Sequence, residues 1–205
     1  MSKFDPVRVA SLLSCAMLLM GAAPAQDVAP DQPIYYANCQ YGIAIIFPGA
    51  SKTPQTRDSR YTIPFYANNL PAHEFYIDRG GNHYSVTVVD FSSGPRADEA
   101  IVEQAAAELR KKGDVRYQAY ADYDPGMPGR QLNIFEPNNR QVRASLYMAY
   151  HKLVITQAEA SVDDNDSIQF EQSIVLVDKD GIDIDRVNAQ DGTGTEPLRK
   201  FPCAR

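Results

Sequence analysis

The sequence of 205 residues contains no tryptophan, three histidines and three cysteines. This is a small supply for a metal centre, because zinc sites draw most of their three or four ligands from histidine and cysteine. The sequence also lacks the glycine-rich phosphate-binding strings and the G-x-S-x-G elbow of hydrolases. These absences leave no catalytic residue to name and no cofactor to expect, and they favour a non-catalytic protein over an enzyme.

Hydrophobic runs of membrane-spanning length are absent as well. The run from Val9 to Ala23 is shorter than the roughly 20 apolar residues that a transmembrane helix needs. It follows a short basic segment and ends in Ala23-Pro24-Ala25, a combination typical of a secretory signal. We therefore expect residues 1–25 to be a signal peptide cleaved after Ala25, and the mature chain to be periplasmic or secreted with no transmembrane segment.

A second processing site stays open in the same segment. Leu12-Leu13-Ser14-Cys15 resembles the lipobox of bacterial lipoproteins, in which the cysteine becomes the lipidated first residue. The apolar run continues past Cys15, so this cut would fall inside the hydrophobic segment. Cleavage after Ala25 is therefore the favoured prediction.

Positive charge is in deficit, with 20 Lys and Arg against 26 Asp and Glu. This balance argues against nucleic acid as a partner, because nucleic-acid binding relies on clustered Lys and Arg. We expect a protein or a small molecule as the partner instead. The twelve tyrosines are typical of a β-rich protein, since this side chain fits a half-buried sheet surface. Five of them are candidates for an exposed aromatic groove, with ordinary sheet packing as the alternative: Tyr117, Tyr120, Tyr123, Tyr147 and Tyr150.

Removal of the signal peptide would take Cys15 with it and leave Cys39 and Cys203. An even pair in an oxidising compartment predicts a disulfide. That bond would close almost the whole mature chain into one loop, for which chain entropy gives about 5 kcal/mol at most. The alternative is a metal site, but two thiols without a neighbouring histidine make a poor one.

The mature chain is expected to form a single α+β domain over residues 39–205. Residues 26–38 carry proline and aspartate and predict a flexible lead-in. The polar residues 50–60 predict a loop, and residues 178–205 predict irregular structure. Alternating apolar residues predict strands at 39–47, 75–77, 83–91, 115–123, 130–136, 140–150 and 153–156.

Two helices are predicted. Apolar residues repeat at helical spacing from Ala97 to Lys112, with acidic residues at the start and basic residues at the end. Gly113 stands where a helix often ends in a left-handed glycine. The second helix is expected to begin near Asp166, which has capping-box spacing to Gln169.

Four strings follow one another along these elements: Phe47-Pro48-Gly49, Gly129-Arg130, Tyr147 and the segment 170–173. Together they resemble the bacterial exported members of the Mog1/PsbP-like fold, over approximately residues 40–177. The resemblance implies a mostly antiparallel sheet with two or more helices packed on it. It implies little about function, because this fold hosts photosystem accessory proteins, a nuclear transport factor and many uncharacterised exported proteins.

The predicted hairpin around Gly80-Gly81 contains a candidate metal site. His73, Glu74 and His83 are predicted to face one another across this turn and to share a divalent metal. The sequence names no further ligand, and exposed strand-edge histidines are the alternative interpretation.

An oxygen-rich string near the C-terminus is a candidate calcium site. It contains Asp178, Asp180 and Asp183, and oxygen-rich loops bind Ca²⁺ outside cells. The spacing departs from the EF-hand pattern, and the alternation of these carboxylates with Ile182 and Ile184 is equally typical of a short exposed strand.

Two functional hypotheses follow from the sequence. The first is an exported, non-catalytic binding or accessory domain. The alternative is a metal-dependent or otherwise unrecognised periplasmic enzyme that uses His73, Glu74 and His83.

Overall fold

The computed structural model describes residues 32–49, 53–184 and 199–203 of the chain. The predicted signal peptide, its cleavage after Ala25 and the alternative lipidation of Cys15 lie outside these residues. Within the part of the chain that is described, no helix is long and apolar enough to cross a membrane.

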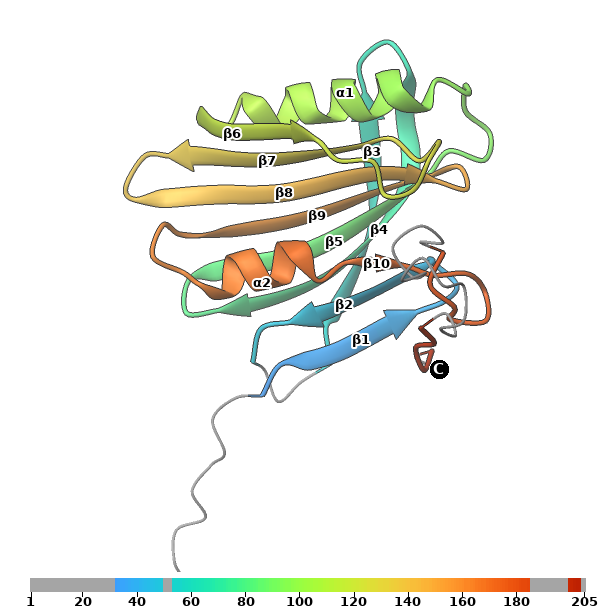
Figure 1. The fold of residues 1–205 in the computed structure, drawn as a ribbon. Coiled ribbons are helices and arrows are strands. Elements are labelled where there is room, and N and C mark those ends of the chain that lie inside the picture. Colours follow the sequence, from blue (N-terminus) through green and yellow to red (C-terminus); the bar gives the residue numbers. More distant parts are fainter. Residues whose placement is uncertain (1–31, 50–52, 185–198, 204–205) are drawn as a thin grey trace, which may run out of the picture.

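A seven-stranded antiparallel sheet forms the centre of the molecule (Figure 1). Most neighbouring strands in it are joined by hairpins, so the chain builds the sheet largely from local pairings. In spatial order its strands are β3 (Gln55–Ile63), β4 (Ala67–Arg79), β5 (Asn82–Asp90), β9 (Lys152–Ser161), β8 (Arg140–Ala149), β7 (Gly129–Glu136) and β6 (Asp114–Tyr120).

A smaller sheet and two helices cover the large sheet. The helix α1 (Asp98–Arg110) packs on one face, and the helix α2 (Asp166–Gln172) packs on the other. The small sheet lies on the same face as α2 and consists of β1 (Ile34–Asn38), β2 (Ile43–Phe47) and β10 (Val175–Leu176). The predicted α+β class, with a mostly antiparallel sheet and two helices packed on it, is confirmed.

Alternation along the strands separates the core into two parts. On β8, Leu146 and Met148 belong to the cluster under α1, whereas Tyr147 and Ala149 belong to the cluster under α2 and the small sheet. All four side chains are buried because both faces of this strand are covered.

The first predicted strand is wrong in its bounds. The structure has two strands there, β1 and β2, and Cys39–Gly42 form the turn between them. The predicted flexible lead-in therefore ends in a strand, Ile34–Asn38. Prolines and aspartates earlier in the lead-in hid this strand, which is held by antiparallel pairing to β2 rather than by a strong local pattern.

The loop predicted at residues 50–60 is also wrong, because β3 begins at Gln55. This strand lies at the edge of the large sheet and pairs only with β4. Most of its side chains are exposed, so it shows no apolar alternation from which a strand could be predicted.

Both helices are confirmed, but their predicted ends differ from the structure. Gly113 is not a left-handed cap: the C-cap is Lys111, and a Cβ on Gly113 would lie 2.2 Å from the carbonyl oxygen of Phe135. The predicted capping box of the second helix is absent. There the backbone N–H of Ser167 donates to the Asp164 carboxylate over 2.8 Å.

Candidate functional site

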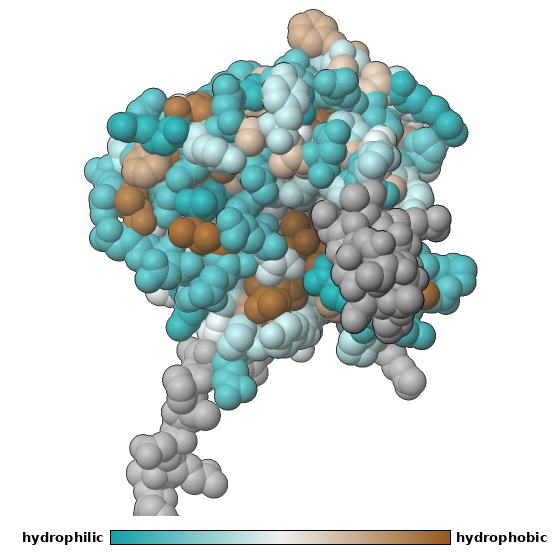
Figure 2. Space-filling view, in the orientation of Figure 1, coloured by the Kyte–Doolittle hydropathy of each residue, from teal (hydrophilic) through white to brown (hydrophobic). Residues whose placement is uncertain are grey.

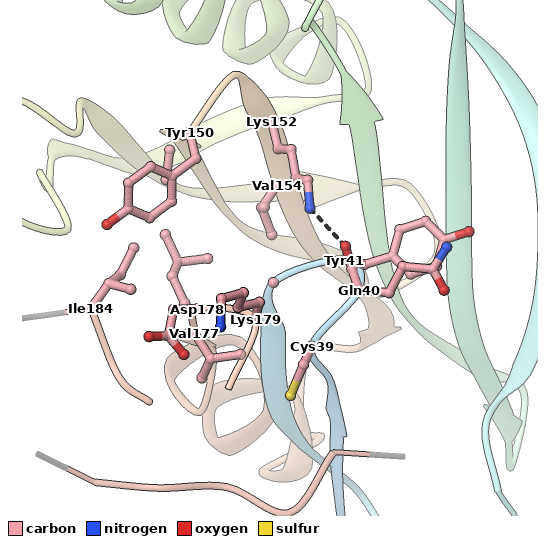
Figure 3. A pocket seen from close by; sticks show the side chains of 13 residues that line it. Cys39, Gln40, Tyr41, Tyr150, Lys152, Val154, Val177, Asp178, Lys179 and Ile184 are labelled. Atoms are coloured by element: carbon pink, nitrogen blue, oxygen red, sulfur yellow. Dashed lines mark hydrogen bonds between the residues drawn. The ribbon is translucent and has the colours of Figure 1, made fainter. Parts of the chain in front are cut away.

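A groove lies on the face of the large sheet that carries the small sheet, and it passes on both sides of Lys152 (Figure 3). Two adjoining cavities, of about 350 and 320 Å³, share Gln40, Tyr41 and Lys152. We call the larger cavity, whose lining includes these three residues, the Lys152 groove. Its walls come from the β1–β2 turn, the β8–β9 hairpin and the segment that follows β10.

The floor of the Lys152 groove is apolar because it continues the core beneath the small sheet. Hydrophobic side chains form small, separate patches on the surface of this face, some of them near its middle (Figure 2). The aliphatic residues that line the groove are Ala149, Val154, Leu176, Val177 and Ile184. Each of them is less than one tenth exposed, so the floor is a fixed part of the fold.

The hairpin that carries Tyr150 has an unusual backbone. Tyr150 and His151 occupy its turn with φ values of 49° and 60°, a left-handed conformation that costs non-glycine residues about 1–2 kcal/mol each. The β7–β8 hairpin has the same geometry but uses Asn138 and Asn139, which tolerate it far better. A hydrogen bond of 2.8 Å from the Phe91 N–H to the His151 carbonyl anchors the turn.

This strained turn sets the rim of the groove. The ring of Tyr150 is 63% exposed and lies beside Ile184 on one side of Lys152, while Tyr41 lies on the other side (Figure 3). Backbone strain of this kind gathers at functional sites, because selection tolerates its cost where geometry matters. Of these two turn residues, Tyr150 is one of the five tyrosines predicted from the sequence to line an aromatic groove, and His151 has no predicted role.

Lys152 is the half-buried cation of the groove, and the second lysine that lines it, Lys179, is exposed. The Nζ of Lys152 donates a hydrogen bond of 2.8 Å to the Gln40 carbonyl (Figure 3). Burial lowers the pKa of the Lys152 amine, and the charge of Asp90 on the neighbouring strand partly offsets this. Within the described ranges, no carboxylate lies within ion-pair distance of Lys152. An ammonium has three N–H donors, and the Gln40 carbonyl takes one of them.

The smaller cavity that adjoins the groove has an aromatic wall. The rings of Tyr41 and His73 stack with centroids 4.5 Å apart, and the Nδ1–H of His73 donates a hydrogen bond to the Asp58 carboxylate. Burial, with the charge of Asp58, raises the pKa of the Tyr41 hydroxyl. This stack makes Tyr41 a fixed wall rather than a mobile side chain.

The structure does not bring the predicted metal ligands together. His73 and Glu74 are consecutive on β4, so they lie on opposite faces of the sheet. Only Glu74 and His83 share a face, 3.6 Å apart, and both also have other partners: Arg57 pairs with Glu74, and Asp78 pairs with His83 over 2.7 Å. No group of three or more His, Cys, Asp or Glu side chains suited to a metal ion occurs among the described residues.

These contacts shift two pKa values in the directions expected for an ion pair. The hydrogen bond with His83 and the charge of Arg57 lower the pKa of Glu74, against the effect of burial. The hydrogen bonds with Glu74 and Asp78 raise the pKa of His83, again against burial. The arrangement is a salt-bridge cluster on the sheet surface.

The predicted calcium residues likewise serve the fold. One Asp178 carboxylate oxygen accepts the backbone N–H groups of Asp180 and Ile182 at 2.8 and 2.9 Å. Asp180 pairs with Lys179 over 2.6 Å. Asp183 is 1% exposed and pairs with Arg199 over 2.7 Å. The side chains of this string therefore hold a turn and the C-terminal segment in place.

The five candidate tyrosines do not line one groove. Tyr147 is buried and packs edge-on against Tyr123 with ring centroids 5.4 Å apart. Tyr120 is exposed on the α1 side, where its ring lies over the guanidinium of Arg130. Tyr117 is exposed on the edge strand β6, so Tyr150 alone of the five lines the Lys152 groove.

The helix α2 carries a buried acid on the side that faces the large sheet, away from the groove. Glu171 is 4% exposed and accepts a hydrogen bond from the Ser145 hydroxyl on β8. Burial raises the pKa of the Glu171 carboxyl, and the hydrogen bond and the charge of Arg143 lessen the shift. The sequence carried no signal for this pair, because its members are far apart in the chain.

The structure contains the predicted disulfide between Cys39 and Cys203, whose Cα atoms are 5.5 Å apart. Cys39 lines the Lys152 groove, and Gly181 packs so closely on the bond that its Cβ would lie 3.3 Å from either sulfur. The disulfide therefore ties the C-terminal segment to the β1–β2 turn at the edge of the groove.

Comparisons with known proteins give no family. No family model matches the sequence, and no curated protein matches it. The structure is similar to cyanobacterial PsbP from Synechocystis, at 12% identity over 75% of this chain and 98% of that one, with a TM-score of 0.48. It is also similar to a Pseudomonas aeruginosa protein of unknown function, at 11% identity over 63% of this chain and 83% of that one, with a TM-score of 0.29. At these scores neither likeness carries an argument, and the Mog1/PsbP-like resemblance stays a prediction.

Proposed function

We propose that this protein is an exported, non-catalytic binding domain that takes up a small molecule in the Lys152 groove. The observation that carries the proposal is the groove itself: a preformed apolar floor with the half-buried Lys152 beside it and a tyrosine rim. Ligand sites in proteins combine these parts, with mostly apolar walls and a few polar groups that orient the ligand. A volume of about 350 Å³ is at the lower end of the range for such sites.

The polar groups around the groove favour binding over catalysis. Asp178 is held by two backbone N–H groups, and His73 is held by Asp58 and Tyr41. Lys152 has no acid or base within ion-pair distance among the described side chains. A paired nucleophile and base, which covalent and acid–base catalysis use, is not assembled from these groups.

Export is part of the proposal, as is a PsbP-like fold. The signal-like residues 1–25 and a disulfide that needs an oxidising compartment both support export. Expression of the full chain in a bacterial host, followed by fractionation and N-terminal sequencing, tests it. We expect periplasmic protein that begins at Gln26. A lipid-modified protein that begins at Cys15 would contradict cleavage after Ala25, and full-length cytoplasmic protein would contradict export.

Binding is tested with the neutral fluorescent probe N-phenyl-1-naphthylamine and the mature wild-type protein. We expect saturable binding with a stoichiometry of one. The substitution Ala149→Phe places a ring in the groove, and we expect it to weaken this binding by about tenfold or more, since the probe loses the space it occupies.

The matched control is Ala119→Phe, which makes the same change on the edge strand β6. We expect it to leave the affinity for the probe unchanged. Equal affinities for wild type and Ala149→Phe would refute the groove as the binding site, provided that near-UV circular dichroism shows both proteins folded.

A further inference from the structure

We infer that the ligand of the Lys152 groove is a monoanionic amphiphile, an apolar body with one carboxylate or sulfonate group that pairs with Lys152. This inference rests on the proposed function, because it names the class of molecule that the same groove takes.

The first step is the pairing of the lysines. Lys111 lies 2.6 Å from Glu108, Lys179 lies 2.6 Å from Asp180, and Lys112 pairs with Glu159. Lys152 is half-buried and has a backbone carbonyl as its partner instead. A partly desolvated ammonium is stabilised when an anion takes its remaining N–H donors. The groove thus holds a cation, Lys152, with N–H donors that no protein acceptor takes among the described residues.

The second step is the state of the acids around the groove. Asp90, the cross-strand neighbour of Lys152, accepts a hydrogen bond of 2.8 Å from the Ser92 N–H. Asp58 binds His73, and Asp178 binds backbone N–H groups. Each of these carboxylates accepts a hydrogen bond from another group, and none of them lies within ion-pair distance of Lys152. An external anion is therefore the group that can complete the coordination of Lys152.

The third step limits the charge of the ligand. The floor beyond Lys152 is aliphatic, formed by Val154, Leu176 and Val177 among others. The floor offers no second cation to a polyanion, and the second lysine at the rim, Lys179, is exposed and pairs with Asp180. A ligand with several charges would have to desolvate them against an apolar wall, which is costly. One anionic group on a hydrophobic body fits both parts of the groove.

The test compares two probes that share one ring system. 1-Anilinonaphthalene-8-sulfonate carries a sulfonate, and N-phenyl-1-naphthylamine lacks it. We expect wild type to bind the sulfonate probe more tightly than the neutral one. We expect Lys152→Gln to weaken binding of the sulfonate probe by about tenfold, the loss of one charge-assisted hydrogen bond, and to leave binding of the neutral probe within about twofold.

Two further variants separate charge from shape. Lys152→Arg keeps the charge, and we expect it to retain most of the affinity for the sulfonate probe. Lys111→Gln removes a cation at the end of α1, where it pairs with Glu108 away from the groove, and we expect no change for either probe. A sulfonate affinity that falls equally in Lys152→Gln and Lys111→Gln would overturn the specific role of Lys152.

The outcomes distinguish this inference from the proposed function. If Ala149→Phe blocks both probes but Lys152→Gln weakens neither, the groove binds ligands and the anionic class is wrong. If Ala149→Phe blocks neither probe, the binding lies elsewhere and the proposed function fails as well. A stoichiometry of one, with the near-UV spectrum of the wild type, is required of every variant in the comparison.

Discussion

Loss of the disulfide should destabilise the whole domain rather than its C-terminal end alone. Cys39 and Cys203 are separated by 164 residues. For a loop of this length the chain-entropy relation gives about 5 kcal/mol, as an upper estimate, of stabilisation through the unfolded state. In a domain of this size each 1 kcal/mol corresponds to about 2–4 °C in Tm, so the full effect would lower Tm by about 10–20 °C.

The assay is urea unfolding of a chain that comprises residues 26–205, followed by circular dichroism. We compare the oxidised wild type, the wild type in reductant and the double variant Cys39→Ala/Cys203→Ala. The last two should agree with each other, because both lack the bond. A local effect is also expected, since the bond holds a segment in which the Phe201 N–H donates to the Gly181 carbonyl over 2.8 Å. Hydrogen exchange at Phe201 measures that local release separately.

A global unfolding free energy that changes by less than about 1 kcal/mol on reduction would refute the entropic argument. Faster exchange at Phe201 with an unchanged midpoint would show that the bond fixes only the C-terminal segment. The slope of the urea transition must also be compared, because a more compact unfolded state lowers the expected gain.

Two further substitutions test the interior of the sheet. Because burial raises the pKa of Glu171 above its ordinary 4.5, its contribution to stability is present below that pH and is lost as the pH rises through the folded-state pKa. Glu171→Gln should therefore reduce the fall of Tm between pH 4.5 and pH 8 and raise Tm at the upper end of that range, although the attraction between Glu171 and Arg143 is lost. If the dependence of Tm on pH is the same in the variant and the wild type, the burial of a charged carboxylate at this position is refuted. Gly129→Ala would place a Cβ 2.5 Å from the ring of Tyr147, and we expect the free energy of unfolding in urea to fall by about 1–3 kcal/mol. An unfolding free energy equal to that of the wild type would show that β7 and β8 separate easily at this point.

The fold class and most elements could be predicted because their signals are local. Helix α1 buries an apolar stripe at helical spacing, and strands such as β8 alternate between two covered faces. Two strands, β1 and β3, were not predicted, and each case has a physical reason. β3 is an edge strand whose side chains are mostly exposed, and β1 depends on pairing with β2, so neither shows in its own residues the burial that marks a strand.

For the candidate sites, prediction from the sequence is limited in a different way. Alternation alone places His73 and Glu74 on opposite faces of a strand, so the predicted metal site could have been dismissed before the structure. The Lys152 groove could not have been predicted, because its walls come from the turn at residues 39–42, the hairpin at 149–154 and the segment 176–184. These three segments lie side by side because the small sheet packs on the large one, and no local sequence pattern predicts that packing.

Three separate features hold the walls of the groove in position. The disulfide ties Cys39 to the C-terminal segment, and the Val177 N–H donates over 3.1 Å to the carbonyl of Gly42, a glycine with φ of 79° whose Cβ would lie 3.2 Å from the Val177 carbonyl. The turn at Tyr150 is held in a strained conformation by its contact with Phe91. Walls fixed before a ligand arrives spare it the cost of ordering them. A rigid apolar floor with one spare cation is therefore better suited to selective capture of a small anionic amphiphile than to docking on a broad, adaptable partner.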